Sequence, residues 1–342
     1  MKKFLFIMIA MLLLVGCSAK DKTEEDQQDE SVMKDTDGSS GVFPLTGKST
    51  DGEKKRRAVA VMINNHPQAR PQSGLSEADI VYELLAEGDI TRLLAVFQSE
   101  TPDQIGPIRS ARDYYIELAK GLDCLYVCHG NSPEAKTMLD KGYVDNLNGL
   151  YYDGTLFQRT TDRKAPHNSY TSFENIEKGA KEKGYELTGA PEPFAFLTEE
   201  EAKGLQGDAA LNIDVVYGDA TSNVHYEYEK AEEKYTRYSN GEQTVEYQSK
   251  KPVLLDNIFI IEAAHQVVDD KGRRKIDLKS GGKGYLLQKG KINEVEWVNK
   301  DDRIIPVING KEVGLVTGKT WVNVIPNQPG IDKNVSFDAQ EN

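Results

Sequence analysis

The stretch that organises this chain, QIGPIRSARDYY, spans Gln104–Tyr115. Proline is favoured in the first turn of a helix, because the N–H that it lacks would have no partner there. The stretch therefore predicts a helix that opens at Gly106-Pro107. The apolar residues that follow recur at helical spacing and should face the core. They are Ile108, Ala111, Tyr115, Leu118 and Ala119.

Two arginines, Arg109 and Arg112, fall in the first turns of this predicted helix. A helix N-terminus carries partial positive charge, so a cation there is locally unfavourable and indicates a place where an anion is expected. The alternative is a surface pair between Arg109 and Asp113 at i, i+4, which would contribute only about 0.3 kcal/mol. The sequence leaves both interpretations open.

The residues before this stretch predict a sheet. Arg57–Ile63 reads RAVAVMI, an apolar run typical of a central strand. It leads into a loop rich in Asn, Pro and Gly at 64–74, and ligands often bind at such carboxyl edges of α/β sheets. The runs 80–86 and 91–98 flank Glu87-Gly88-Asp89 and predict a hairpin. Strands and helices alternate irregularly here, which predicts a mixed α/β sheet.

The second half of the chain has short predicted strands separated by turns such as Asn309-Gly310. This spacing is typical of a barrel or sandwich. The predicted fold class is therefore α+β. The predicted parts are a mixed α/β ligand-site domain at 42–190, a linker at 191–207 and a mostly β domain at 208–330.

The N-terminal residues 1–17 combine Lys2 and Lys3 with an apolar run that is short for a bilayer span. The run ends in Leu14-Val15-Gly16-Cys17, which resembles the lipobox of bacterial lipoproteins. The resemblance implies a signal peptide cut before Cys17, which then carries lipid such as palmitate. The mature chain would be anchored by that lipid at the outer face of the cytoplasmic membrane of a Gram-positive cell. Residues 18–41 are acidic and polar and predict a disordered tether.

Charge and cysteine content exclude some classes of function. The net charge of the 342 residues is −13, which disfavours nucleic-acid binding, so an anion site would have to be a local basic pocket. Cys124 and Cys128 lie in a predicted strand about 13 Å apart, too far for a disulfide, and are expected to be buried small hydrophobes. No motif predicts a metal site or a cofactor.

Several groups of residues are distinctive in combination. They are Asn64-Asn65-His66, Ala69–Gly74, Ala78–Glu83, Glu87–Arg92, Gly106–Arg112, Pro166-His167-Asn168 and Gly318–Val322. Together they resemble one family, the YerB family of Bacillus-type lipoproteins. The similarity runs from the lipobox to about residue 328, with mild departures at Asp89 and Ile108. It implies two domains, the second largely β, and it implies no reaction, because the function of the family is unknown.

The residue types suited to anion binding gather in the first half of the chain. An arginine fork binds phosphate or carboxylate with two hydrogen bonds. The predicted ligand-binding residues are Asn64, Asn65, His66, Arg70, Arg92, Arg109, Arg112, His129 and His167. The leading hypothesis is a pocket that binds an anionic cell-wall or lipid-linked ligand.

Two other functions use different chemistry. A cell-envelope hydrolase could employ His129 or His167 as general base, oriented by Glu83 or Glu87. No nucleophile elbow or metal-ligand motif accompanies them, so no catalytic residue is assigned. A scaffold could instead dock a protein partner on the sheet edges of the β-rich domain.

Overall fold

The computed structural model describes residues 41–50, 56–218 and 220–340. The predicted signal peptide, the predicted lipidation site Cys17 and all but the last residue of the predicted tether lie outside the described residues. In the described part of the chain, no helix has the length and apolar character needed to cross a membrane.

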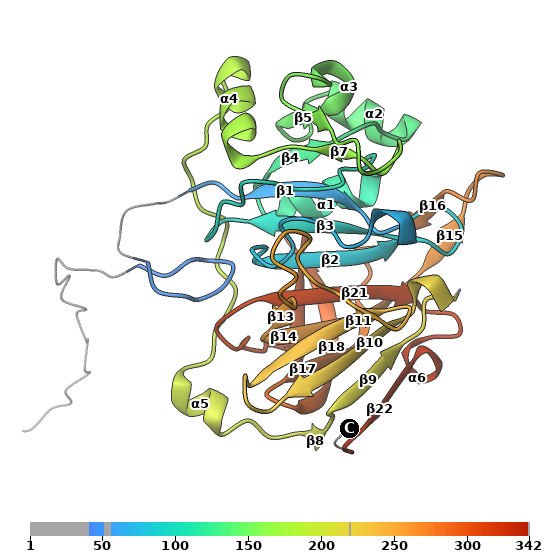
Figure 1. The fold of residues 1–342 in the computed structure, drawn as a ribbon. Helices are drawn as coiled ribbons and strands as arrows, with labels where there is room; N and C mark the ends of the chain where they lie inside the picture. The colour runs from blue at the N-terminus through green and yellow to red at the C-terminus, as the bar shows by residue number, and fades with distance from the viewer. Residues whose placement is uncertain (1–40, 51–55, 219, 341–342) are drawn as a thin grey trace, which may run out of the picture. The chain divides into compact units, whose positions relative to one another are not determined.

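The largest sheet has 12 strands. Those from the first half of the chain are β1 (Val59–Asn64), β2 (Ile80–Leu85), β3 (Thr91–Phe97), β4 (Leu125–Cys128) and β5 (Asn146–Asn148). Those from the second half are β8 (Asp208–Ala209), β14 (Asn257–Ala263), β17 (Gly282–Gln288), β18 (Lys291–Lys300), β19 (Arg303–Ile308), β20 (Lys311–Glu312) and β21 (Thr320–Pro326). Their order is β20-β19-β18-β17-β14-β21-β2-β3-β1-β4-β5, with β8 paired to β18 (Figure 1).

A six-stranded sheet and two strand pairs complete the β structure. The six strands are β9 (Asn212–Val215), β10 (Val224–Glu229), β11 (Lys234–Ser239), β12 (Glu242–Gln243), β13 (Leu254–Leu255) and β22 (Val335–Asp338). The pairs are β6 (Gln158–Arg159) with β7 (Ser169–Tyr170), and β15 (His265–Val267) with β16 (Arg274–Ile276).

The helices are short. They are α1 (Asp113–Gly121), α2 (Pro133–Asp140), α3 (Gly149–Tyr152), α4 (Phe173–Lys183), α5 (Glu199–Lys203) and α6 (Ile331–Asn334), with 3₁₀ turns at Pro67–Ala69 and Ala220–Ser222. In Figure 1, α2, α3 and α4 gather near β4 and β5, whereas the described residues of the β-rich second half carry only α5 and α6 as α-helices. The predicted α+β fold class is confirmed.

Both faces of β1 are covered by hydrophobic cores, which explains why its sequence is apolar almost throughout. Met62 and its even-numbered neighbours pack into one hydrophobic core together with Tyr115 of α1. Val61 and its odd-numbered neighbours pack into a second core that contains Ile176 of α4 and Tyr226 of β10. Successive strand residues point to opposite faces, so a strand covered on both faces must be apolar at every position. The prediction of a central strand is confirmed.

The hairpin and the cysteine prediction are also confirmed. The strands β2 and β3 pair antiparallel, with Leu85 opposite Thr91. Cys124 and Cys128 are both free and buried in the core that contains Met62. Burial raises the pKa of the Cys128 thiol to about 12, so this thiol is uncharged and unreactive at neutral pH.

One sheet continues across the predicted domain division. The strand β21 comes from the last part of the chain and pairs in parallel with β14 on one side and β2 on the other. The two predicted domains therefore share one sheet, and the described residues belong to one compact unit. The predicted division at 191–207 stays a prediction.

The predicted helix start at Gly106-Pro107 is wrong, because α1 begins only at Asp113. The preceding residues are extended, and Ile108 forms an antiparallel bridge with Ile63 of β1. Gly106 has a φ of +151°, and a Cβ there would lie 2.8 Å from the carbonyl oxygen of Ser169. Backbone partners on neighbouring strands satisfy this segment, so it has no need of helical hydrogen bonds. The five apolar residues are nevertheless all buried, as predicted.

Candidate functional site

The candidate site lies at one edge of the large sheet. The strands β1 and β4 are parallel neighbours, so their carboxyl ends, Asn64 and Cys128, meet at the same edge. The extended segment 105–112 crosses these ends: Arg109 N–H donates to the Met62 carbonyl at 2.8 Å, and His129 N–H donates to the Arg109 carbonyl at 3.0 Å. This path brings Arg109 to the strand ends, where an open α/β sheet commonly binds ligands.

The guanidinium of Arg109 is partly buried, and no hydrogen bond or ion pair to it occurs among the described residues. Burial lowers the pKa of Arg109 to about 10, with a further contribution from the charge of Arg92. An arginine of this kind loses hydration without gaining a carboxylate partner, which is unfavourable unless an anion occupies the place. The alternative pair between Arg109 and Asp113 is absent from the described part of the chain.

Two imidazoles lie close enough to Arg109 for its charge to lower their pKa values. The rings of His66 and His167 stack with their centroids 4.6 Å apart and an interplanar angle of 28°. Burial, followed by neighbouring positive charge, lowers the pKa of His66. Burial also lowers the pKa of His167, with smaller contributions from His66 and Arg109. Both rings are therefore mainly neutral at pH 7.

The hydrogen bonds of these rings fix their tautomers. The Asn64 Oδ1 accepts the backbone N–H of His66 at 3.0 Å. The Asn64 Nδ2 is therefore oriented to donate to Nδ1 of His167 at 2.9 Å. Nδ1 of His66 accepts the Gln68 N–H at 3.2 Å. A neutral imidazole has one donor and one acceptor nitrogen, so in both rings Nε2 carries the hydrogen and is a donor.

Asn64, His66, Arg109 and His167 together form what we call the Arg109 cluster. The guanidinium and the two Nε2–H groups are all donors. Within the described ranges, no carboxylate makes an ion pair with any of the four residues. A set of donors without a negative partner is suited to an anion and unsuited to a metal ion, which requires electron-pair donors.

Two predicted site arginines are placed differently. Glu87 holds both of them: one carboxylate oxygen accepts from Arg92 at 2.5 Å, and the other accepts from Arg112. Arg92 also donates to the Ser110 carbonyl at 2.6 Å. Burial is the main cause of the lowered pKa of both arginines. Their charges are shared with Glu87, so the structure does not bring them into the Arg109 cluster.

Asn65 is buried and Arg70 is partly buried, and hydrogen bonds within the protein occupy both side chains. The Asn65 amide donates to Thr91 at 2.8 Å and to Glu83 at 3.1 Å. Arg70 donates to the backbone carbonyls of Asn65 and Thr221, at 2.8 and 2.9 Å. Both side chains therefore connect parts of the protein and leave few donors for a ligand.

Sequence reasoning did not find the partner of Glu83. This carboxylate is 0% exposed and pairs at 2.7 Å with Arg237, which is 1% exposed. The indole N–H of Trp321 donates to the same carboxylate at 3.0 Å, and the Arg237 guanidinium lies 4.5 Å from the indole ring centre. Glu83 and Arg237 are 154 positions apart, so no local pattern could have indicated this pair.

His129 lies at the same sheet edge with all of its nitrogens engaged. Its Nδ1 lies 2.7 Å from the Ser169 hydroxyl, and its Nε2 lies 2.9 Å from the Arg159 guanidinium. Arginine can only donate, so Nε2 is the acceptor and Nδ1 carries the hydrogen. Arg159 in turn pairs with Asp153 at 3.0 Å. In this arrangement His129 has no free lone pair with which to remove a proton.

The residues suggested to orient a catalytic histidine are engaged elsewhere. Glu83 is buried against Arg237, and Glu87 is held by Arg92 and Arg112. Neither glutamate contacts His129 or His167 in the hydrogen bonds of the described residues. Groups of three or more His, Cys, Asp or Glu residues that could hold a metal ion are also absent from the part of the chain that the structure describes.

Comparisons with known proteins agree with this architecture. The model of the N-terminal domain of the family described as "Protein of unknown function (DUF3048)" matches residues 45–186, and that of its C-terminal domain matches residues 213–322. The chain is 45% identical, over 331 residues and 96% of each chain, to the Bacillus subtilis (strain 168) protein named "Putative lipoprotein YerB".

A solved structure is similar over most of its length. The crystal structure of the YerB protein from Bacillus subtilis has a TM-score of 0.81 and 47% sequence identity, and the similarity covers 87% of this chain and 99% of that one. Identity at this level over nearly the whole chain shows common descent, and the matched domain models cover both halves. The chain therefore belongs to the YerB family, the two-domain DUF3048 family of proteins of unknown function.

Proposed function

We propose that this protein is anchored by lipid to the outer face of the cytoplasmic membrane and binds an anionic envelope ligand through the Arg109 cluster. One observation carries the proposal. Arg92, Arg112 and Arg237 each have a carboxylate partner, and Arg70 donates to backbone carbonyls, whereas the Arg109 guanidinium has neither kind of partner among the described residues. A binding site for an anion needs an arginine whose charge is not already neutralised.

The surroundings of Arg109 favour a small oxyanion. The two neutral imidazoles offer N–H groups, and both rings lie within the electrostatic influence of the Arg109 guanidinium, so an oxyanion could accept from several donors at once. The whole chain carries a net charge of −13, which would repel an anion elsewhere on the surface. The cluster is therefore a local exception within an acidic protein.

The anchor part of the proposal rests on the N-terminal sequence and on the relative. Leu14-Val15-Gly16-Cys17 resembles a lipobox, and the Bacillus subtilis relative is named as a lipoprotein. A lipid on Cys17 would keep the anion site close to the polymers and lipid-linked phosphates of the envelope. Labelling of cells with a clickable palmitate analogue should mark the wild-type protein and should leave Cys17→Ser unlabelled.

Binding fits the geometry better than hydrolysis does. A hydrolase of the kind considered above needs a histidine with a free lone pair and a carboxylate that orients it. His129 is engaged by Arg159, and Nδ1 of His167 accepts from Asn64. The described residues therefore offer a site that can hold an anion without an evident general base.

The test is calorimetric titration of the protein with glycerophosphoglycerol, a phosphodiester whose charge stays at −1 across the working pH range. The wild type is expected to bind, and Arg109→Gln is expected to lose at least tenfold in affinity, since a charge-assisted contact contributes about 1.5–3 kcal/mol. Arg159→Gln is the matched control, because Arg159 lies at the same edge but is paired with Asp153.

The control should bind like the wild type, and circular dichroism should show that all three proteins are folded. Wild-type protein that binds no phosphodiester would refute the proposed function. Equal loss in Arg109→Gln and Arg159→Gln would place the site elsewhere at this edge.

A further inference from the structure

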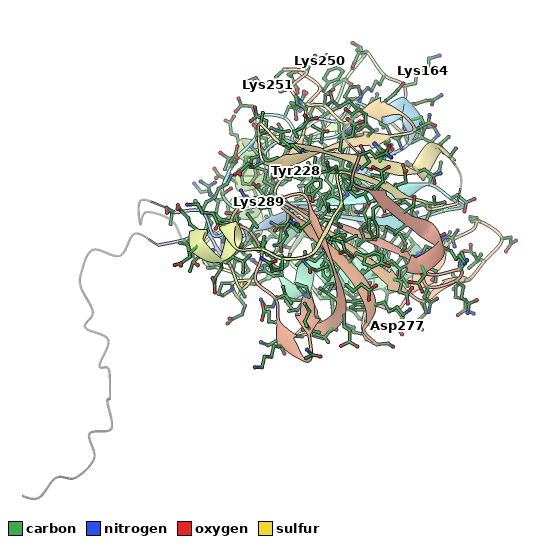
Figure 2. The ribbon with its side chains drawn as sticks, turned by 90° about the horizontal axis from the view of Figure 1, so that it is seen from below. Lys164, Tyr228, Lys250, Lys251, Asp277 and Lys289 are labelled. Carbon is green, nitrogen blue, oxygen red and sulfur yellow. The ribbon has the colours of Figure 1, made fainter. Side chains whose placement is uncertain are left out.

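Two loops from opposite halves of the chain meet next to the Arg109 cluster. One is 160–167, which carries Arg163, Lys164 and His167. The other is the turn 246–251, which the Val245–Pro252 bridge closes and which carries Lys250 and Lys251. Figure 2 shows Lys164, Lys250 and Lys251 at the same end of the molecule.

Tyr247 holds these loops together. Its hydroxyl donates to Asp162 at 2.7 Å, and its N–H donates to the Gln72 carbonyl at 2.9 Å. The guanidinium of Arg163 lies 4.8 Å from the centre of the Tyr247 ring, and the Lys250 ammonium lies 4.4 Å from it. Cation–π contacts position a cation without neutralising its charge.

The positive charges of this region are not cancelled by ion pairs. Arg163 donates to three neutral acceptors, the carbonyls of Ala69 and Pro71 and the Tyr170 hydroxyl. Lys164, Lys250 and Lys251 are exposed, and in the described part of the chain none of them makes an ion pair.

The two carboxylates of these loops are engaged. Asp162 accepts from the Tyr247 hydroxyl. Glu246 accepts from the Gly74 N–H at 2.8 Å and from the Tyr247 N–H at 3.0 Å. Each carboxylate oxygen that accepts a hydrogen bond from a neutral donor keeps its charge, so these residues reduce the positive potential without removing it.

The cluster and the loops are continuous. The His167 N–H donates to the Lys164 carbonyl at 2.9 Å, and the positive charges of Arg109 and Arg163 both lower the pKa of His167. His167 therefore connects the Arg109 cluster to Arg163, which shares the Tyr247 ring with Lys250. A single small anion would leave most of these cations without a partner.

We infer that the ligand of the Arg109 cluster is one unit of a polymer of repeating phosphodiesters, whose neighbouring phosphates contact Lys164, Lys250 and Lys251. This inference rests on the proposed function and narrows it to one class of ligand. Flexible lysines suit successive phosphates of a mobile chain, because an ammonium is a compact charge with no fixed direction.

Two other polyanionic surfaces fit less well. An anionic membrane is usually contacted by cations together with apolar side chains that insert among the lipids. The exposed large apolar residues of the described chain include none in 160–167 or 246–251. A single-stranded nucleic acid needs free aromatic faces for its bases, whereas the Tyr247 ring is already covered by Arg163 and Lys250.

The experiment compares a monomer with a polymer. Wild type, Arg109→Gln and the triple variant Lys164→Gln/Lys250→Gln/Lys251→Gln are titrated with glycerophosphoglycerol and with a poly(glycerol phosphate) chain at several salt concentrations. The matched control is Lys275→Gln/Lys300→Gln/Lys311→Gln, which removes the same charge from exposed lysines of β16, β18 and β20.

The triple variant should bind the monomer like the wild type and the polymer at least tenfold more weakly. Its slope of log affinity against log salt should fall by up to about two, because each phosphate contact contributes about 0.7 on a single chain. Arg109→Gln should lose both ligands, and the control should keep both.

Unchanged polymer affinity and salt slope in the triple variant would overturn this inference and leave the proposed function intact. A wild type that binds neither ligand would refute the proposed function as well. Two further titrations use vesicles that contain phosphatidylglycerol and, separately, a poly(dT) oligonucleotide. Lysine-dependent binding to either of these, without binding to the polymer, would also overturn the inference.

Discussion

Two arginines of this protein, Arg237 and Arg109, face opposite electrostatic situations. Arg237 is 1% exposed and is matched by the Glu83 carboxylate at 2.7 Å, by Trp321 and by Thr244. Arg109 is partly buried and has no carboxylate within the described residues. Both are removed from water, but only the first is neutralised by the protein itself. The difference indicates that one arginine stabilises the fold and that the other is kept available for a ligand.

The two arginines that Glu87 binds are intermediate between Arg237 and Arg109 in how far their charge is neutralised. These two, Arg92 and Arg112, are 5% and 7% exposed and share a single carboxylate. Arginine content alone therefore says little about function at this edge. What matters is how many carboxylates reach each guanidinium, and this depends on chain segments that are distant in sequence.

The largest effect is expected from Arg237→Gln, which would leave the charge of Glu83 buried without a cation. Loss of one partner of a buried ion pair costs about 3–5 kcal/mol. Urea unfolding should show this loss, and the double variant Glu83→Gln/Arg237→Gln should be less destabilised than the sum of the two single variants. Arg159→Gln removes an exposed pair and should cost less than about 1 kcal/mol. Equal losses of unfolding free energy in Arg237→Gln and Arg159→Gln would contradict the structural role assigned to Arg237.

A smaller loss, of about 2–3 kcal/mol, is expected from Glu87→Gln, because Arg92 and Arg112 would then be buried without a negative partner. In this variant Arg92 and Arg112 no longer share a carboxylate, so an anion from solution can take its place. Sulfate should therefore raise its thermal midpoint more than it raises that of the wild type, beyond the general stabilisation by this salt. If both midpoints rise equally, the two arginines do not form an anion site even when Glu87 is neutral.

The pH dependence of phosphodiester binding should show that the ligand lies at the Arg109 cluster, which has two titratable histidines, and away from the buried Glu83–Arg237 pair. Burial and neighbouring positive charge lower the pKa of His66 and His167 below 6.5 in the free protein. A bound anion raises both pKa values, so binding takes up protons and becomes tighter as pH falls. The added proton goes to Nδ1, so each ring that is protonated gives up the hydrogen bond that its Nδ1 accepts. Affinity for glycerophosphoglycerol should rise as pH falls from 7.5 to 5.5, and a total increase of about one pKa unit would limit this rise to about tenfold.

Substitution of the two imidazoles tests the origin of this rise. The double variant His66→Asn/His167→Asn cannot titrate in this range and should bind with nearly constant affinity. His225→Asn is the control, because His225 pairs with Asp214 on the six-stranded sheet. A pH-dependent rise that survives in the double variant would show that other groups take up the protons.

The smallest effect should be that of Arg109→Gln on stability. This substitution removes a charge that has no carboxylate partner in the described chain, so the free energy of unfolding should change by less than about 0.5 kcal/mol in either direction. Thermal and urea unfolding without ligand measure it. A loss as large as that of Arg237→Gln would mean that Arg109 is a structural residue.

Several features of the fold could be predicted from local sequence. The apolar run in β1, the hairpin of β2 and β3 and the burial of Cys124 and Cys128 all follow from patterns of a few residues. Such patterns suffice because side chains of a strand alternate between faces, and a strand covered on both faces has no polar position. The predicted α+β class follows from the same patterns.

The prediction that a helix starts at Gly106-Pro107 was wrong because of tertiary contacts. The residues 106–112 have a proline and apolar spacing suited to a helix, but their backbone groups bond to β1 and to the neighbouring loops instead. Gly106 is required there by close contact with Ser169 and Tyr170, which are distant in sequence. Local propensity is a weak preference that such contacts readily override.

The candidate site shows the same division. The sequence by itself determined which residue types are present, namely arginines, histidines and amides near strand ends, and that the protein around them is acidic. Only the tertiary structure decided that Glu83 reaches Arg237, that Glu87 reaches Arg92 and Arg112, and that no carboxylate of the described chain reaches Arg109. The physical reason is that charge neutralisation depends on distances of a few ångströms, which are set by the packing of segments far apart in the chain.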